Sequence, residues 1–224
     1  MKKTGIKVWM VCLLMAVLMA AAPQMDGNAA ELLEKTKVTG LKVVSAKESS
    51  ITLSWNPGKG ASGYEILRYC GTEEKARVLI KINGGSTAQY TDRRLRSNSS
   101  YRYKIRAFVE RKGIEVYGRY SSEIKADTLL RAPKVSAVPM KLKKQAALIW
   151  HKVPGAAGFE VYRADQRKGA YTRIASVSKN LLISRYTDKN LDRKNTYYYK
   201  RRAYKMDKNK KVYGAYSSVK KVKM

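Results

Sequence analysis

The sequence predicts an all-β protein that contains two tandem antiparallel β-sandwiches, and two observations support this prediction. One pattern of about 95 residues occurs twice in the chain, with its matching positions 95 or 96 residues apart. Apolar and polar residues also alternate with the two-residue period of a half-buried strand, as in residues 51–55 and 101–107. A repeat of this length can close a hydrophobic core of its own, whereas the shorter repeats of solenoid proteins cannot. We therefore expect two separate globular modules.

Three motifs recur in the same order in both units. A Trp precedes a Gly-aromatic-Glu-aliphatic strand, a Tyr-Thr-Asp-x-x-Leu loop leads into a Tyr-rich strand, and Val-Tyr-Gly precedes Tyr-Ser-Ser. In the first unit these motifs occupy Trp55, 63–66, 90–95, 101–108 and 116–122, and in the second they occupy Trp150, 158–161, 186–191, 197–204 and 212–218.

These motifs resemble those of the fibronectin type III module, and the resemblance covers residues 36–224. It implies an immunoglobulin-like β-sandwich in each unit. It also implies a tyrosine corner, in which Tyr101 and Tyr197 hydrogen-bond back to the loops that carry Leu95 and Leu191.

The first residues of the chain have the pattern of a secretory signal peptide, which we assign to residues 1–29. Lysines precede an apolar stretch over residues 8–22, and small polar residues follow up to Ala30. About 15 apolar residues fall short of the roughly 20 that span a bilayer, although an uncleaved anchor is the alternative. We expect cleavage between Ala22 and Ala30, no transmembrane segment afterwards, and a secreted protein that associates with the cell wall.

The rest of the chain is divided into module 1, residues 36–130, and module 2, residues 131–224. The boundary lies where Pro133 interrupts strand pairing. After cleavage Cys70 is the single cysteine, so no intramolecular disulfide can form. Stability must then come from the two hydrophobic cores, for which Trp55 and Trp150 are the expected anchors.

Charge is distributed unevenly between the two modules. The whole chain has 47 Lys and Arg against 17 Asp and Glu, a net charge of +30. Residues 30–130 contain 19 basic and 11 acidic side chains, while residues 131–224 contain 25 and 5, a net charge of +20. Such a domain attracts polyanions, among them wall polymers, acidic polysaccharides, nucleic acid and anionic lipid. The alternative is a charge that serves solubility alone.

Strand alternation places cations and aromatic side chains of module 2 on one outer sheet face, next to Glu160. An ordinary solvated face, with Arg stems packed on Tyr rings and paired with Glu, is the alternative to a binding surface. Together with the lysines of the last hairpin, the candidate polyanion-binding residues are Tyr198, Lys200, Arg202, Tyr204, Lys208, Lys210 and Lys211.

Arg201 is expected on the inward face, where the first repeat has Ile105. It would then reach out to solvent, find a buried partner or shift the register of its strand.

The sequence argues against an enzyme. His151 is the only histidine, which excludes a Ser-His-Asp triad and a multi-histidine metal site. Asp92 and Asp188 occupy the same turn in separate modules, so turn capping explains them better than catalysis. We expect no catalytic, cofactor-binding or metal-binding residues.

The functional prediction is a secreted, non-catalytic binding or spacer protein of the cell surface or envelope, with the basic module 2 binding anionic polymers. The resemblance suggests a Gram-positive type of bacterium. An anionic cell-wall polymer or polysaccharide is the expected ligand, and a protein partner or unspecific nucleic acid stays open. The alternatives are an accessory module that works in trans with a wall hydrolase or glycosidase, and an adhesin for nucleic acid or glycosaminoglycan.

Overall fold

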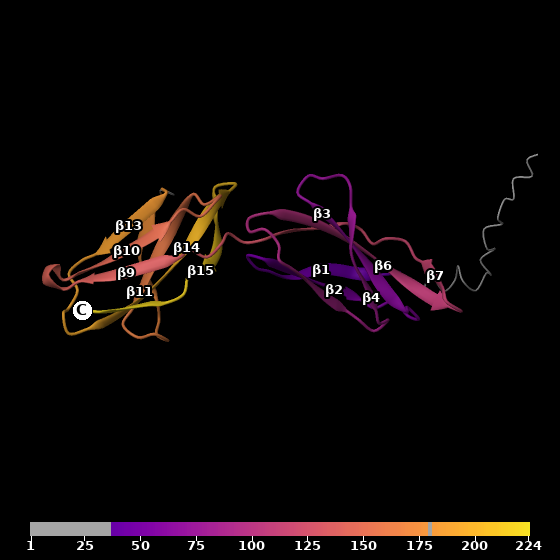
Figure 1. Cartoon of the computed structure of the whole chain (residues 1–224), viewed down its shortest axis with the longest axis horizontal. Coiled ribbons are helices and arrows are strands. Elements are labelled where there is room, and N and C mark those ends of the chain that lie inside the picture. The colour runs from indigo at the N-terminus through magenta and orange to yellow at the C-terminus, as the bar shows by residue number, and fades with distance from the viewer. Residues whose placement is uncertain (1–36, 179–180) are drawn as a thin grey trace, which may run out of the picture.

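The computed structural model describes residues 37–178 and 181–224, and this part of the chain is all-β apart from one short 3-10 helix (Figure 1). The predicted signal peptide lies outside the described residues. Four antiparallel sheets form two sandwiches, one in each repeat. The predicted fold class is therefore confirmed.

Module 1 packs a sheet ordered β1-β2-β5 against a sheet ordered β4-β3-β6-β7, and β8 pairs with the beginning of β6. The strands of the first sheet are β1 (Thr39–Ala46), β2 (Ser50–Asn56) and β5 (Gln89–Arg93). Those of the second sheet are β3 (Gly63–Cys70), β4 (Arg77–Asn83), β6 (Ser100–Arg111), β7 (Ile114–Tyr117) and β8 (Ile124–Asp127).

Module 2 repeats this topology, with sheets ordered β13-β10-β9 and β12-β11-β14-β15, and β16 pairs with the beginning of β14. The first sheet contains β9 (Val135–Met140), β10 (Gln145–His151) and β13 (Ile183–Asp188), and the 3-10 helix η1 (Lys141–Lys143) connects β9 to β10. The second contains β11 (Gly158–Ala164), β12 (Thr172–Val177), β14 (Thr196–Asp207), β15 (Lys210–Tyr216) and β16 (Lys220–Lys223).

Each core lies between the two sheets of its module and follows from strand alternation. In β2 the inward residues Ile51, Leu53 and Trp55 are buried, while the residues between them are half-buried. The ring of Trp55 meets that of Tyr64 edge to face at 5.3 Å between centroids, and the equivalent pair in module 2 has the same spacing. Such ring pairs add to the free energy gained from area burial.

The loop between the two sheets has the hydrogen bond of a tyrosine corner in both modules. The Tyr101 hydroxyl accepts a hydrogen bond from the backbone N–H of Arg96 at 2.9 Å, and the Tyr197 hydroxyl accepts one from Asp192 at 3.0 Å. Leu95 and Leu191 are buried beneath these loops, at 8% and 1% exposure.

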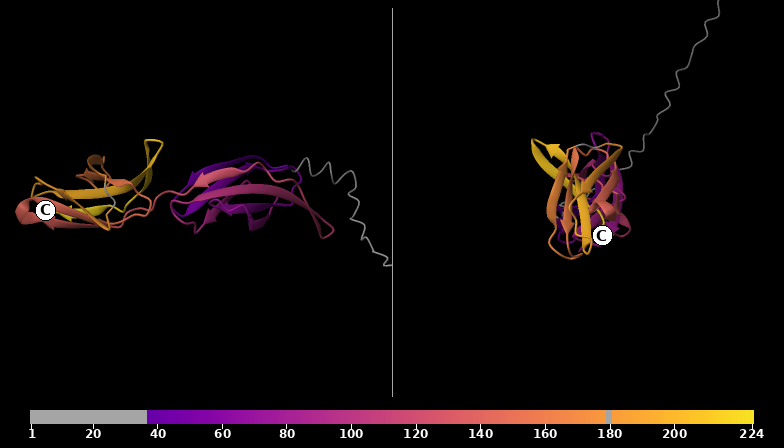
Figure 2. Two further views of the ribbon diagram at one scale, coloured as in Figure 1. Left: turned by 90° about the horizontal axis from the view of Figure 1, so that it is seen from above. Right: turned by 90° about the vertical axis from the view of Figure 1, so that its left-hand side faces the viewer.

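The two modules lie end to end, joined by the segment between Asp127 and Val135 (Figure 2). The side chain of Leu130 is 2% exposed and packs within the core of module 2. The Ala132 N–H donates to a Glu48 carboxylate oxygen at 2.8 Å. The boundary after residue 130 stays a prediction, and this packing argues that the folded unit of module 2 begins at Leu130, since the backbone of Leu129 is hydrogen-bonded to module 1.

Candidate binding surface

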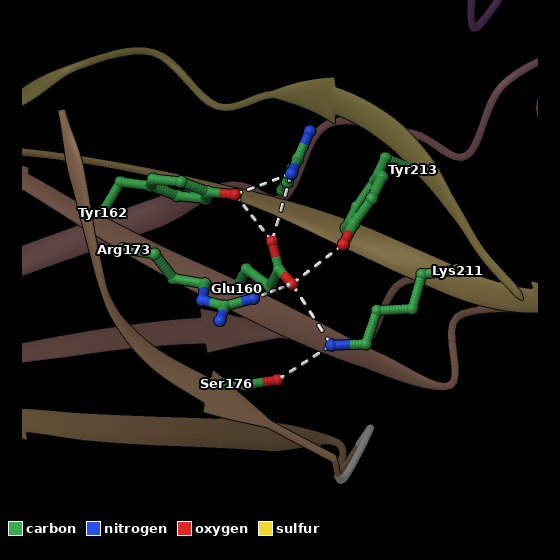
Figure 3. Close-up of polar contacts among 7 residues, drawn as sticks. Glu160, Tyr162, Arg173, Ser176, Lys211 and Tyr213 are labelled. Atoms are coloured by element: carbon green, nitrogen blue, oxygen red, sulfur yellow. Dashed lines mark hydrogen bonds and ion pairs between the residues drawn. The ribbon is translucent and has the colours of Figure 1, made fainter. Parts of the chain in front are cut away.

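A buried carboxylate organises the outer face of the larger sheet of module 2 (Figure 3). Glu160, in the middle of β11, is 0% exposed because side chains from β11, β12, β14 and β15 converge on it. Its partners are Tyr162 at 2.6 Å, Tyr213 at 3.0 Å, Arg173 and Arg202 each at 3.1 Å, and Lys211 at 3.2 Å.

The protonation of Glu160 depends on these donors. Burial alone would raise the pKa of the Glu160 carboxyl, but hydrogen bonds from Tyr162, Lys211, Tyr213 and Arg202 lower it to about 2. At neutral pH Glu160 is therefore a carboxylate whose charge is shared among several cations.

Arg202 is held mainly by contacts within the protein. Its guanidinium lies 3.5 Å from the ring centroid of Tyr213 and donates to the Tyr162 hydroxyl at 2.7 Å. Cation–π contacts and the ion pair with Glu160 therefore occupy much of this side chain. The face matches the alternative of Arg stems packed on Tyr rings and paired with Glu.

Module 1 contains a smaller version of the same cluster. Glu65, 8% exposed, accepts from the Arg106 guanidinium at 2.7 Å and from the Tyr120 hydroxyl at 2.6 Å. The Arg106 guanidinium lies 4.1 Å from the ring centroid of Tyr117. This cluster of Glu, Arg and Tyr side chains is present in both modules, although module 1 is far less basic. It is therefore part of how this sheet face is built, and it does not by itself indicate ligand binding.

The structure splits the candidate residues into separate groups. Tyr198 and Lys200 are half-buried in the sheet face, and the Lys200 ammonium lies 4.2 Å from the ring centroid of Tyr171. Lys208 and Lys210 are exposed at the tip of the β14–β15 hairpin.

Two of the candidates do not offer a free charge or ring. The prediction that Tyr204 is exposed is wrong, since Tyr204 is 5% exposed, adjoins Tyr213 and lies beneath the Lys211 ammonium at 4.4 Å. Lys211 is itself paired with Glu160.

The second repeated carboxylate has a role that sequence reasoning missed. The expectation of a turn cap is wrong, because Asp188 is the last residue of β13 and its carboxylate contacts side chains of the facing sheet. It lies 3.1 Å from the Arg163 guanidinium and accepts a hydrogen bond from the Tyr199 hydroxyl at 2.8 Å. Asp92 forms the same contacts in module 1 with Arg68 and Tyr103. These contacts link the two sheets of each sandwich, and burial beside a carboxylate raises the pKa of Tyr199 and Tyr103. The exact repetition of Tyr-Thr-Asp was the available signal.

Arg201 lies in the core, as its alignment with Ile105 suggested, and does not reach solvent. It is 2% exposed, and its guanidinium lies 4.1 Å from the ring centroid of Trp150. One nitrogen donates to the Ile149 carbonyl at 3.4 Å, while Nε and the other terminal nitrogen have no hydrogen-bond partner in the described part of the chain. Burial lowers the pKa of Arg201 to about 9. Arg201 is therefore a poorly satisfied buried cation.

The buried acidic groups of module 2 are already paired, so they do not offset the charge of the exposed cations. Of the five carboxylates in residues 131–224, Glu160 and Asp188 are buried and ion-paired. Those left exposed are Asp165, Asp192 and Asp207.

Among residues 37–178 and 181–224, no group of three or more His, Cys, Asp or Glu side chains is placed to hold a metal ion. Cys70 and His151 lie in different modules, at the ends of β3 and β10. Within the same ranges no helix is long and apolar enough to cross a membrane.

No family model matches the chain, and no curated protein matches its sequence. Among solved structures it is similar to a two-domain fibronectin type III segment of chicken tenascin, at 16% identity over 84% of this chain and 99% of that one, with a TM-score of 0.46. It is also similar to the FN1–FN3 domains of chicken CNTN1, at 16% identity over 82% of this chain and 65% of that one, with a TM-score of 0.39.

The class of protein follows from the sheets themselves. In each module a three-stranded sheet packs against a larger sheet. In the larger sheet the third strand of the module lies between its fourth and sixth strands: β3 lies between β4 and β6, and β11 lies between β12 and β14. The chain is a tandem pair of fibronectin type III-like β-sandwiches.

Proposed function

We propose that this protein is a secreted, non-catalytic binding and spacer unit of the cell surface or envelope, and that module 2 binds an anionic polymer of the wall. The observation that carries the proposal is the exposed charge of module 2. Residues 131–224 have a net charge of +20, and their buried carboxylates, Glu160 and Asp188, are already paired with cations of the module. The carboxylates left exposed on the rest of its surface are Asp165, Asp192 and Asp207.

This charge is larger than solubility requires of a small domain, for which a net charge of about 2 to 8 suffices. A polyanion brought to such a surface releases its condensed counterions, which favours binding at low salt. The end-to-end arrangement of the modules supports the spacer role, since module 1 would hold the basic module away from whatever precedes residue 37 (Figure 2).

Cell fractionation tests this proposal. The mature protein is expected in the wall fraction of the producing cells and should be released by high salt, because exposed charges are screened beyond about 8 Å at physiological ionic strength and over shorter distances in more salt. Cells that lack the anionic wall polymer serve as the control and should release the protein into the medium. Retention that withstands high salt would contradict electrostatic binding and favour a protein partner, such as a wall enzyme.

A further inference from the structure

Four segments of module 2 meet at the end that is remote from module 1, where the C-terminus also lies (Figure 1). They are η1 with Lys144, the β11–β12 turn, the β13–β14 loop and β16. The Leu191 N–H donates to the Lys144 carbonyl at 2.9 Å, the Arg193 guanidinium donates to the Leu142 carbonyl at 3.0 Å, and the Met224 N–H donates to the Asn195 carbonyl at 3.1 Å. These bonds hold three of the segments together.

The β11–β12 turn joins the same end through the sheet. Ala164, the last residue of β11, pairs with Tyr198, and Tyr198 pairs with Lys221 of β16. The turn that follows Ala164 therefore lies at the end of the sheet where β14 begins and β16 ends.

Ten exposed cations crowd this end, and we call them the distal cluster. None of the ten forms an ion pair within the described residues, and the exposed carboxylates in the same segments are Asp165 and Asp192. The members of the distal cluster are Lys141, Lys143, Lys144, Arg167, Lys168, Lys189, Arg193, Lys194, Lys221 and Lys223.

Module 1 provides an internal comparison. Its equivalent end, formed by the β1–β2 and β3–β4 turns, the β5–β6 loop and the end of β8, does not carry a cluster of cations alone. There, basic side chains alternate with acidic ones, and that end contacts the linker and module 2. Its basic residues are Lys47, Lys75, Arg93, Arg94, Arg96 and Lys125, and its acidic residues are Glu48, Glu73, Glu74 and Asp127.

Three of those acidic positions are lysines in module 2. Asp127 pairs with Ser100 as Lys223 pairs with Thr196, so Asp127 and Lys223 are equivalent. The Leu95 N–H donates to the Ser49 carbonyl, and the Leu191 N–H donates to the Lys144 carbonyl, so Ser49 and Lys144 are equivalent. The residues immediately before them, Glu48 and Lys143, are therefore equivalent too.

The third pair lies in the turn after the third strand of each sandwich. Counted along the repeat, Glu73 corresponds to Lys168. The fold alone therefore does not require cations at this end, since module 1 has the same sheet topology with carboxylates at these positions.

We propose that the distal cluster is the anion-binding site of module 2 and that its ligand is a linear polymer of phosphate groups. This inference rests on the proposed function and locates it away from the sheet face around Glu160. Eight of the ten cations are lysines, which are compact point charges, whereas bidentate recognition of single carboxylates or phosphates uses the planar fork of arginine. The aromatic side chain of the β11–β12 turn, Tyr171, is engaged within the protein: its hydroxyl donates to the Arg167 carbonyl at 3.1 Å, and its ring centroid lies 4.2 Å from the Lys200 ammonium. Lysines spread over four segments suit a flexible chain of closely spaced phosphates.

The test uses the mature full chain and inorganic polyphosphate as the probe. The distal variant carries Lys143→Glu, Lys168→Glu and Lys223→Asp, which are the residues that module 1 has at these positions. The control variant carries Arg131→Glu, Lys134→Glu and Lys152→Glu, which change exposed basic residues of module 2 that belong neither to the distal cluster nor to the candidates named from the sequence, and cause the same loss of net charge. Circular dichroism and thermal unfolding confirm that both variants are folded.

The distal variant should bind polyphosphate at least about tenfold more weakly in low salt and show a shallower logarithmic salt dependence, because fewer phosphates are neutralised. The control variant should lose less than about twofold. Equal losses in both variants would overturn the distal site while leaving polyanion binding by module 2 intact. No binding by the wild-type chain in low salt would overturn the proposed function as well.

Vesicles of anionic phospholipid form a separate arm, because Leu142 protrudes beside the cluster at 90% exposure. The proposal expects vesicle binding weaker than polyphosphate binding at equal phosphate concentration. Vesicle binding that depends on Leu142, with no binding of polyphosphate, would overturn the polymer and indicate a membrane surface.

Discussion

Replacing Glu160 with Gln removes the negative charge that the sheet face of module 2 is built around. The ordinary pKa of 4.5 falls to about 2 in the folded protein. At about 1.4 kcal/mol for each tenfold change in the acid constant, this shift corresponds to about 3 kcal/mol of stability at neutral pH. The variant also leaves Arg173, Arg202 and Lys211 facing one another without a counter-charge.

We therefore expect Glu160→Gln to lower the free energy of unfolding of module 2 by about 3 kcal/mol, measured by denaturant unfolding at neutral pH. The sign of the pH dependence follows from the lowered pKa: the contribution is fully present above about pH 4.5 and is lost as the pH falls through about 2. The gap between wild type and variant should therefore narrow in acid.

Glu65→Gln is the matched control in module 1, where two partners, Arg106 and Tyr120, contact the carboxylate. It should cost less than Glu160→Gln. A change of less than about 0.5 kcal/mol for Glu160→Gln, or a gap that does not vary with pH, would refute the role assigned to this carboxylate. Because the distal cluster is separate from this face, Glu160→Gln should change polyphosphate affinity by less than about twofold.

Two further predictions concern the core of module 2. Arg201→Ile, which introduces the residue that module 1 has at this position, should raise the free energy of unfolding of module 2 by about 1 to 2 kcal/mol, because it removes a poorly satisfied buried charge. A decrease of several kcal/mol would show that the contact of Arg201 with Trp150 outweighs the cost of burying its charge. A fragment of residues 129–224 should be more stable than 131–224 by about 2 to 3 kcal/mol, because it retains the buried Leu130; equal melting temperatures would place the boundary after residue 130.

Much of the fold could be predicted because local periodicity determines which residues a strand turns inward. The alternation in residues 51–55 and 101–107 reports directly on burial, and the repeat shows that the same sandwich is built twice. Arg201 was recognised as an inward residue for the same reason.

The candidate site was harder to predict because it depends on side chains from strands distant in sequence. Alternation indicates that Tyr204 points away from the core, but not that Tyr213 and Lys211 cover it. The same limit applies to Asp188, whose partners Arg163 and Tyr199 come from two other strands.

The distal cluster could not be predicted from charge alone, since its ten residues come from four segments between Lys141 and Lys223. The topology decides which turns share one end of a sandwich. One signal was nevertheless present in the sequence: aligning the repeats sets Glu48 opposite Lys143 and Asp127 opposite Lys223.

Titration of the mature chain, residues 30–224, into a purified anionic wall polymer at several salt concentrations tests the central claim most directly. We predict binding in low salt that weakens steeply and log-linearly with added salt, and a shallower slope for the distal variant than for wild type. The absence of binding in low salt, or an affinity that does not change with salt, would contradict the account and leave the charge of module 2 as a solubility feature of a spacer.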